Sequence, residues 1–213
     1  NKKQLAKVKK ITLQNSVSQA IISSVVPSLN NTITDFLNEC SVRFCFFKNL
    51  SNKINLKINI KNKEEVGDDR LVNILYAKEK YKKSVVVIDF GTATTFDILN
   101  KEGVYFGGII TPGIELSLNI LKLKTEKLPL VEFKKTKTVV GFSTKEAIQS
   151  GFYWGYYSMI EGLIKKINKE LNDEFRIILT GGNAKYFKKS FGNTILVDEH
   201  FTSRALNFIL GKL

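Results

Sequence analysis

One stretch constrains the fold of this 213-residue chain more than any other, and it runs from Ser84 to Gly113, SVVVIDFGTATTFDILNKEGVYFGGIITPG. It opens with the apolar run Val85 to Phe90, which is interrupted only by Asp89 and predicts a strand buried on both faces. A carboxylate at the end of a buried strand is costly unless a cation or several donors compensate its charge. The stretch therefore predicts a sheet with a charged binding site where its first strand ends.

The rest of this stretch predicts a turn, two more strands and a helix. Gly91 lies where the chain must turn, and its missing Cβ lets a ligand approach the backbone. Thr92 offers a hydroxyl and an N–H side by side. Residues 94–110 predict two strands joined by a hairpin. Thr111 and Pro112 are suited to the N-cap and the first position of a helix.

The order of the predicted elements indicates an internal duplication. Before Ser84 we expect a helix tail, a strand, a helix, a strand (with a half-exposed strand over 53–61) and a helix. From Ser84 on we expect three strands, a helix, a long helix over 144–171, a strand, a helix, a strand and a helix. The first half thus looks like the second with its opening strands removed, which predicts a missing N-terminal segment. We expect an α/β protein whose mixed sheets are flanked by helices, in halves 1–82 and 83–213, with the terminal helix packing back on the first half.

Composition excludes several classes of function. The net charge of +13 could attract nucleotides or nucleic acid, but Lys, Asn and Ile are abundant everywhere. Because no basic patch interleaved with aromatic residues stands out, we expect no nucleic-acid partner. No apolar run has the length of a membrane span and no signal peptide is visible, so we expect no membrane partner. Cys40 and Cys45 fit reduced core thiols, and the expected location is the cytoplasm.

Two further motifs have both a functional and a structural interpretation. Gly181 and Gly182 follow a predicted buried strand that ends in Thr180, a pattern that is equally typical of an ordinary strand-to-helix turn. Residues 67–70, GDDR, open a predicted helix, where acidic residues usually complement the helix dipole. The lone His200 lies outside these motifs, and the chain has no constellation for serine, cysteine or zinc chemistry.

The long helix over 144–171 predicts an interface. It carries Gly151 and Gly155 together with Tyr153, Trp154, Tyr156 and Tyr157. A helix rich in glycine and aromatic residues is more often a packed core or a subunit interface than a ligand site. Because this helix presents more aromatic surface than one small domain covers, we expect a homodimer.

Together these motifs resemble the type III pantothenate kinases, which belong to the actin/hexokinase/Hsp70 kinase superfamily. The resemblance covers nearly the whole chain, through SSVVPSL, EVGDDR, IDFGTATTFD, GGIITPG, KLPLVE, the Thr144 region and LTGGNAKYF. It implies a duplicated actin-like (ribonuclease H-like) fold. It also implies transfer of the γ-phosphoryl group of ATP to pantothenate, which gives 4′-phosphopantothenate in the first step of coenzyme A biosynthesis. The implied cofactors are Mg²⁺ with ATP and a monovalent cation, K⁺ or NH₄⁺, and the pantothenate pocket is implied to lie near a subunit interface.

The resemblance also implies roles for individual residues. The catalytic base falls on Asp69, and the monovalent cation falls on Asp89. The implied substrate-binding residues are Gly67, Asp68, Asp69, Arg70 and Thr144. The implied nucleotide-binding residues are Gly91, Thr92, Gly181 and Gly182.

The chain departs from the family pattern in three places. The family's opening phosphate motif, Asp-x-Gly-Asn-Thr, does not occur in this sequence, and Ile60 stands where many members have a Tyr. Asp68 replaces a residue that is usually small, which puts an extra charge beside the base. The alternative functions are a non-enzymatic, kinase-like transcriptional accessory protein and a basic nucleic-acid-binding protein. Loss of Asp69 or Thr92 would favour the accessory protein, and both residues are present.

Overall fold

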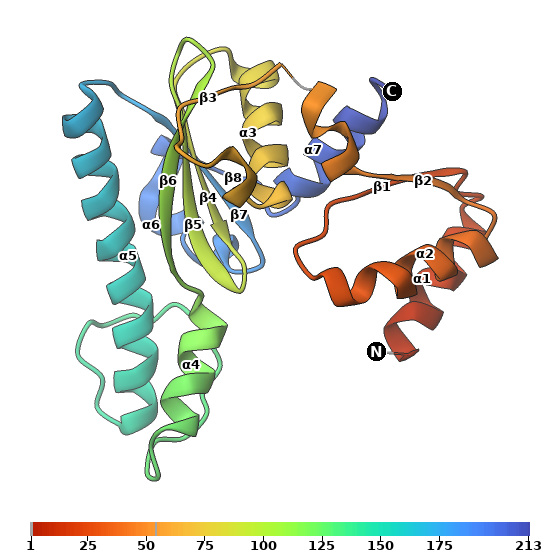
Figure 1. Cartoon of the computed structure of the whole chain (residues 1–213). Helices are drawn as coiled ribbons and strands as arrows, with labels where there is room; N and C mark the ends of the chain where they lie inside the picture. The colour runs from red at the N-terminus through yellow and green to blue at the C-terminus, as the bar shows by residue number, and fades with distance from the viewer. Residues whose placement is uncertain (1, 54) are drawn as a thin grey trace. The chain divides into compact units, whose positions relative to one another are not determined.

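A computed structural model describes residues 2–53 and 55–213 of the chain, which divide into two compact units. The helices, labelled in Figure 1, are α1 (Lys2–Gln14), α2 (Asn30–Glu39), α3 (Asp68–Tyr81), α4 (Ile114–Leu123), α5 (Thr144–Leu171), α6 (Lys188–Phe191) and α7 (Phe201–Leu210). The strands are β1 (Gln19–Ile22), β2 (Arg43–Phe46), β3 (Lys57–Ile58), β4 (Val85–Phe90), β5 (Ala93–Leu99), β6 (Val104–Pro112), β7 (Arg176–Gly181) and β8 (Ile195–Val197). Unit 1 contains residues 1–56, 61–76 and 202–213, and unit 2 contains residues 57–60 and 77–201.

Unit 1 is built on a short parallel sheet of β1 and β2. The connection between the two strands is a 3₁₀ turn at Pro27–Leu29 followed by α2. Ile22 of β1, Leu37 of α2 and Val42 just before β2 form one buried cluster. The helix therefore covers the sheet through the apolar side chains that its sequence spaces along one face.

The last helix belongs to unit 1. Ala205 and Ile209 of α7 share a buried cluster with Val72 of α3 and with Phe47. Ala205 and Ile209 are four residues apart, so they lie on one face of α7 and bury the same stripe. The predicted division of the chain at residues 82 and 83 stays a prediction.

Unit 2 contains a six-stranded mixed sheet in the order β3-β6-β5-β4-β7-β8. Strand β4 runs antiparallel to β5 and parallel to β7, and β5 runs antiparallel to β6. Residues 85–88 of β4 are completely buried, which confirms the prediction of a strand covered on both faces. A mixed α/β architecture with helices flanking the sheets is therefore confirmed, whereas the duplication and the lack of opening strands stay predictions.

Helix α5 covers one face of this sheet. Tyr153, Ile160 and Ile167 of α5 pack in one cluster with Ile88 of β4 and Phe96 of β5. These three helical residues recur every seven positions, which keeps them on one side of the helix.

The ends of α5 are set by local hydrogen bonds. Ser143 Oγ, at the N-cap, accepts a hydrogen bond from the Glu146 amide at 3.2 Å. The Glu146 carboxylate accepts one from the Phe142 amide at 2.9 Å. The Glu146 amide is one of those that a helix start leaves without partners, and the second bond ties the residue before the N-cap to the first turn. At the other end, Asn172 adopts the left-handed conformation, with φ 48°, and stops the helix.

One sequence-based prediction of secondary structure is wrong, and another is borne out only over part of its range. Thr111 and Pro112 do not open α4; they end β6, where Pro112 pairs with Ala93, and Gly113 is the N-cap. The ladder with β5 continues to this point, so the helix can begin only after it. In the predicted strand over 53–61, Lys57 and Ile58 form the strand β3, while Ile54 lies outside the described residues. The described helices include none that is long and apolar enough to cross a membrane.

Candidate functional site

The first group of predicted site residues lies where β4 and β7 end. In the parallel ladder Asp89 pairs with Thr180, and Phe90 pairs with Gly181. Gly181 has φ +86°, and a Cβ placed on it would lie 2.7 Å from Asp89 Oδ1 and 2.6 Å from the Phe90 carbonyl oxygen. Both the left-handed backbone and the crowding require glycine here. The register therefore brings the Asp89 carboxylate directly against the Gly181 backbone.

The turn of Gly91 and Thr92 packs against the start of α4. The Gly91 amide donates to the Ala93 carbonyl at 3.0 Å, and the Gly113 amide donates to the Thr92 carbonyl at 2.9 Å. A Cβ on Gly113 would collide with the carbonyl oxygens of Gly91 and Thr92. The exposed residue Thr92 thus adjoins the N-cap of α4 through its backbone, and a helix N-terminus suits phosphate. Gly113 is not among the site residues that the sequence motifs predicted.

Gly182 completes this edge of unit 2. It is exposed, and a Cβ on it would meet no atom within 4 Å. The four predicted nucleotide-binding residues and Asp89 therefore belong to one unit, at the ends of β4 and β7. This edge therefore combines the carboxylate of Asp89, the hydroxyl of Thr92 and the exposed backbone of Gly182.

The second group of predicted residues opens α3 in unit 1. Asp68 and Asp69 form the first turn of the helix, and the Gly67 carbonyl accepts hydrogen bonds from the amides of Arg70, at 3.1 Å, and Leu71, at 3.2 Å. Asp69 Oδ1 also accepts a hydrogen bond from the Arg70 amide, at 2.9 Å. This bond fixes the direction of the carboxylate that is predicted to be the base.

The SSVV segment lies against this loop. A Cβ on Gly67 would lie 2.6 Å from Asp69 Oδ1 and 3.6 Å from Val25 Cγ1. Ser24 Oγ donates to Asn30 Oδ1 at 2.5 Å, which ties the segment to the start of α2. Glycine at position 67 is therefore needed so that the Asp69 carboxylate can turn back over the loop. Two motifs that are more than forty residues apart in the sequence thus adjoin in one unit.

The half-buried Asp68 has a perturbed pKa. Burial raises its pKa above the usual value; the charge of Lys48 opposes this shift, and the neighbouring Asp69 adds to it. The folded state therefore holds a proton on Asp68 to a higher pH than the unfolded state does. Ionisation of Asp68 consequently lowers stability as the pH rises from about 4 through the raised folded pKa.

We expect Asp68→Asn to raise the melting temperature at pH 7 and to leave it nearly unchanged near pH 3. The amide cannot ionise, so the variant avoids the destabilisation that the carboxylate brings at neutral pH. Because Asp68 is partly exposed, solvent screening keeps the gain small. Thermal unfolding of both proteins between pH 3 and pH 7 measures the difference. A variant that loses stability at pH 7 would show that the attraction of Asp68 to the helix dipole dominates instead.

None of the contacts found among the described residues connects Thr144 with either of these two groups. It is the exposed first residue of α5, and that end of the helix is held by its own preceding loop. Trp154 Nε1 donates to the Thr138 carbonyl at 3.2 Å, and Ser150 Oγ donates to the Val139 carbonyl. The loop from α4 is thus tied to the first half of α5.

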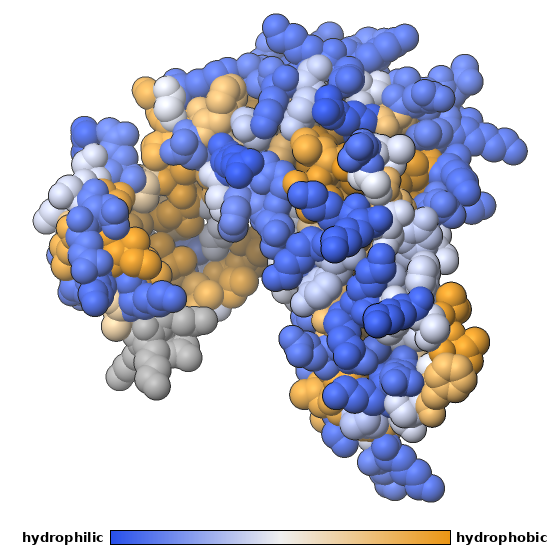
Figure 2. All heavy atoms as spheres, turned by 180° about the vertical axis from the view of Figure 1, so that it is seen from behind, coloured by the Kyte–Doolittle hydropathy of each residue, from blue (hydrophilic) through white to orange (hydrophobic). Residues whose placement is uncertain are grey.

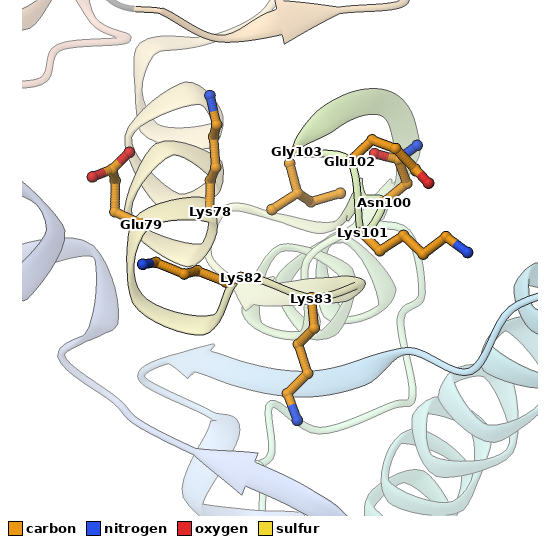
Figure 3. A pocket seen from close by; sticks show the side chains of 9 residues that line it. Lys78, Glu79, Lys82, Lys83, Asn100, Lys101, Glu102 and Gly103 are labelled. Carbon is orange, nitrogen blue, oxygen red and sulfur yellow. The ribbon is translucent and has the colours of Figure 1, made fainter.

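A lysine-rich pocket in unit 2 lies between the end of α3 and the β5–β6 hairpin, and none of its lining residues belongs to these motifs. Its lining includes Lys78, Lys82, Lys83 and Lys101. Figure 3 shows the ends of these four side chains pointing in different directions instead of toward one point. The pocket therefore presents no convergent set of cations for an anion. Among the described residues, no group of three or more His, Cys, Asp or Glu side chains is placed to hold a metal ion.

Comparison with known proteins identifies the family. The sequence model for type III pantothenate kinase matches residues 2–166, which is most of the chain. The chain belongs to the type III pantothenate kinases. The type III pantothenate kinase of Persephonella marina is 45% identical over 180 residues, which cover 83% of this chain and 69% of that protein. The type III pantothenate kinase of a Sulfurihydrogenibium species is 39% identical over 196 residues, which cover 92% of this chain and 78% of that protein.

A solved structure shares the fold at lower identity. It is a crystal structure from Campylobacter jejuni, described as a conserved candidate transcriptional activator of the Baf family. The TM-score is 0.59 at 17% identity, and the match covers 92% of this chain and 83% of that one. At this identity the likeness concerns the fold alone, so it does not favour a transcriptional role over the kinase family.

Proposed function

We propose that this chain is a pantothenate kinase, which transfers the γ-phosphoryl group of ATP to the hydroxyl of pantothenate and gives 4′-phosphopantothenate. This is the first step of coenzyme A biosynthesis, and we place it in the cytoplasm. The observation that carries the proposal is the family membership, with 45% identity to a type III pantothenate kinase over 83% of the chain.

The predicted residues suit the requirements of phosphoryl transfer, which are positioning, charge neutralisation and an oriented nucleophile. We assign Asp69 as the base that accepts the proton of the pantothenate hydroxyl, with its carboxylate held by the Arg70 amide. Gly67, Asp68, Arg70 and Thr144 are the proposed pantothenate contacts. The guanidinium of Arg70 is suited to hold a carboxylate.

The edge of unit 2 is the proposed phosphate site. Thr92 and Gly91 bind phosphate oxygens next to the N-terminus of α4, while Gly181 and Gly182 let the nucleotide approach the backbone. Asp89 fits a cation, because it is a half-buried carboxylate at the end of a buried strand and at an exposed edge. Mg²⁺ bound with ATP, and K⁺ or NH₄⁺ at Asp89, would supply positive charge that offsets the negative charge of the phosphates.

A coupled assay of ADP release tests this function on the full-length protein. We expect ADP release from ATP and Mg²⁺ in K⁺ buffer to depend on added pantothenate. Release that does not change when pantothenate is added would contradict the proposal. A product with the mass of 4′-phosphopantothenate provides the second, independent readout.

We also propose the duplicated actin-like fold, which the two parallel strand pairs support. In unit 1, β1 and β2 are parallel and joined through a helix, α2. In unit 2, β7 and β8 are likewise parallel and joined through α6. The same strand-helix-strand pattern thus occurs once in each unit.

A homodimer is the proposed assembly, and the exposed apolar face of α4 supports it better than the aromatic residues of α5 do. The aromatic residues of α5 pack against the core of unit 2. In α4, by contrast, Leu116, Ile120 and Leu123 lie on one face and are 43%, 46% and 73% exposed, while Ile114 and Leu118 fill the core on the other face. Figure 2 shows apolar side chains on the surface at its lower right, where α4, α5 and their connecting loop lie. A helix that is apolar on both faces indicates a partner surface.

We expect the protein to sediment as a dimer at micromolar concentration and Ile120→Lys to shift it toward the monomer. A lysine in the centre of the apolar face places a charge where the interface would exclude water. Leu13→Lys, at a residue of α1 that is 58% exposed, is the matched control and should leave the dimer intact. A monomeric wild type, or equal dissociation of the two variants, would contradict this assignment of the interface.

A further inference from the structure

A second carboxylate, that of Asp198, follows β8 in the same sheet, two strands from Asp89 and at the same level of the sheet. In the β7–β8 ladder Leu179 pairs with Val197, and the amide of Asp198 donates to the Leu179 carbonyl at 2.9 Å. Paired residues of neighbouring strands point to the same face of a sheet, and each following residue points to the opposite face. Asp198 therefore occupies the position beside Thr180, and Asp89 is the partner of Thr180 on the other side.

The side chain between these two carboxylates is buried and polar. Thr180 is 1% exposed, and its Oγ1 has no hydrogen-bond partner within the described part of the chain. A buried hydroxyl without a partner is unfavourable, so such groups usually await a ligand, an ion or a water molecule. Asp198 is itself only 8% exposed. The sheet thus buries a hydroxyl between two acidic positions at the proposed phosphate edge.

We propose that Asp198 and Thr180 join Asp89 as oxygen ligands of the cation at the end of β4. The inference rests on the proposed function, because that function places a cation at Asp89. Carboxylate and hydroxyl oxygens are the donors that hard cations prefer, and a cation would compensate the two acidic charges. Asp198 Oδ1 accepts a hydrogen bond from the His200 amide at 3.1 Å, which sets the orientation of the carboxylate.

Cation-dependent thermal unfolding of the full-length protein tests the site with a readout that needs no turnover. Melting temperatures are measured while K⁺ replaces choline at constant ionic strength, and separately while Mg²⁺ is added. We expect the wild type to melt at a higher temperature as one cation binds. For Asp198→Asn, the cation concentration that gives half of the full increase in melting temperature should be at least tenfold higher than for the wild type. The asparagine carbonyl can still accept the His200 hydrogen bond, so the substitution removes the charge and keeps this contact.

Thr180→Val separates a ligand role from a structural one. Without cation, the variant should melt at the same temperature as the wild type or higher, because valine removes the unpartnered hydroxyl. Its half-saturating cation concentration should nevertheless rise at least tenfold. Asp173→Asn is the control, because Asp173 accepts hydrogen bonds from Ser84 and the Glu174 amide near the start of β7, at the opposite edge of the sheet.

The outcomes are distinct. Unchanged cation responses in both Asp198→Asn and Thr180→Val would overturn the inference, as would a wild type that responds to neither cation. A response to K⁺ alone or to Mg²⁺ alone identifies the bound ion and supports the site. A protein that shows the cation effects without pantothenate-dependent ADP release would overturn the proposed function and still support the cation site.

Discussion

Asp69→Asn is expected to lower kcat of the full-length protein by roughly 10²- to 10⁴-fold, or about 3–5 kcal/mol of barrier, with nucleotide binding nearly unchanged. Asparagine keeps the shape of the side chain, and its carbonyl oxygen can still accept the Arg70 amide that Asp69 Oδ1 accepts at 2.9 Å. What it loses is the ability to take a proton from the pantothenate hydroxyl. Because the loss concerns the transition state, it should appear in kcat at saturating pantothenate.

Asp68→Asn is the internal control for this experiment. Asp68 precedes Asp69 in the first turn of α3, and consecutive residues of a helix point in different directions. Its kcat should fall by less than about tenfold. If both aspartates merely complemented the helix dipole, each would contribute roughly 0.3–1 kcal/mol of stability and neither would matter for turnover. Equal kcat values for the two variants would therefore contradict the catalytic assignment.

Gly181→Ala is expected to lose roughly 1–3 kcal/mol of stability and to bind ATP more weakly. The new Cβ would lie 2.6 Å from the Phe90 carbonyl and 2.7 Å from Asp89 Oδ1, on a backbone with φ +86°. Relief of this crowding must move either the end of β4 or the Asp89 carboxylate. Denaturant unfolding measures the loss of stability, and titration with ATP measures the loss of affinity.

Gly182→Ala is the matched control one residue later. A Cβ at this exposed position meets nothing within 4 Å, so the change in stability should stay within about 0.5 kcal/mol. If the alanine still weakens ATP binding, Gly182 lies where the nucleotide approaches. Equal losses of stability in the two variants would show that crowding of the new Cβ does not cause the loss at Gly181.

Local patterns predicted most of the elements around the proposed phosphate site. The apolar run before Asp89 predicted β4, because a strand buried on both faces needs apolar residues at consecutive positions. Ser143 and Glu146 predicted the start of α5, because their side chains satisfy the amides there. In both cases the information lies within a few residues of the feature.

Features that depend on strand register could not be predicted in the same way. Thr180 and Asp198 meet because β8 pairs with β7, which no local pattern of the sequence specifies. Thr111 and Pro112 carry the signature of a helix start, yet pairing with β5 holds them in β6. Gly113 was missed as a site residue because its closeness to the Gly91 turn arises only when β6 and β5 align.

The central place of β4 has a consequence for the synthesis of the chain. Its partner β5 follows within a few residues, but Val85 pairs on the other side with Arg176, far along the chain. At ~5–20 residues per second, roughly 5–20 s pass on the ribosome before β7 can cover that side. During this time the strand exposes an apolar edge with unpaired backbone groups, which is a template for mispairing between nascent chains. The segment that positions Asp89 is therefore also one that a chaperone would protect during translation.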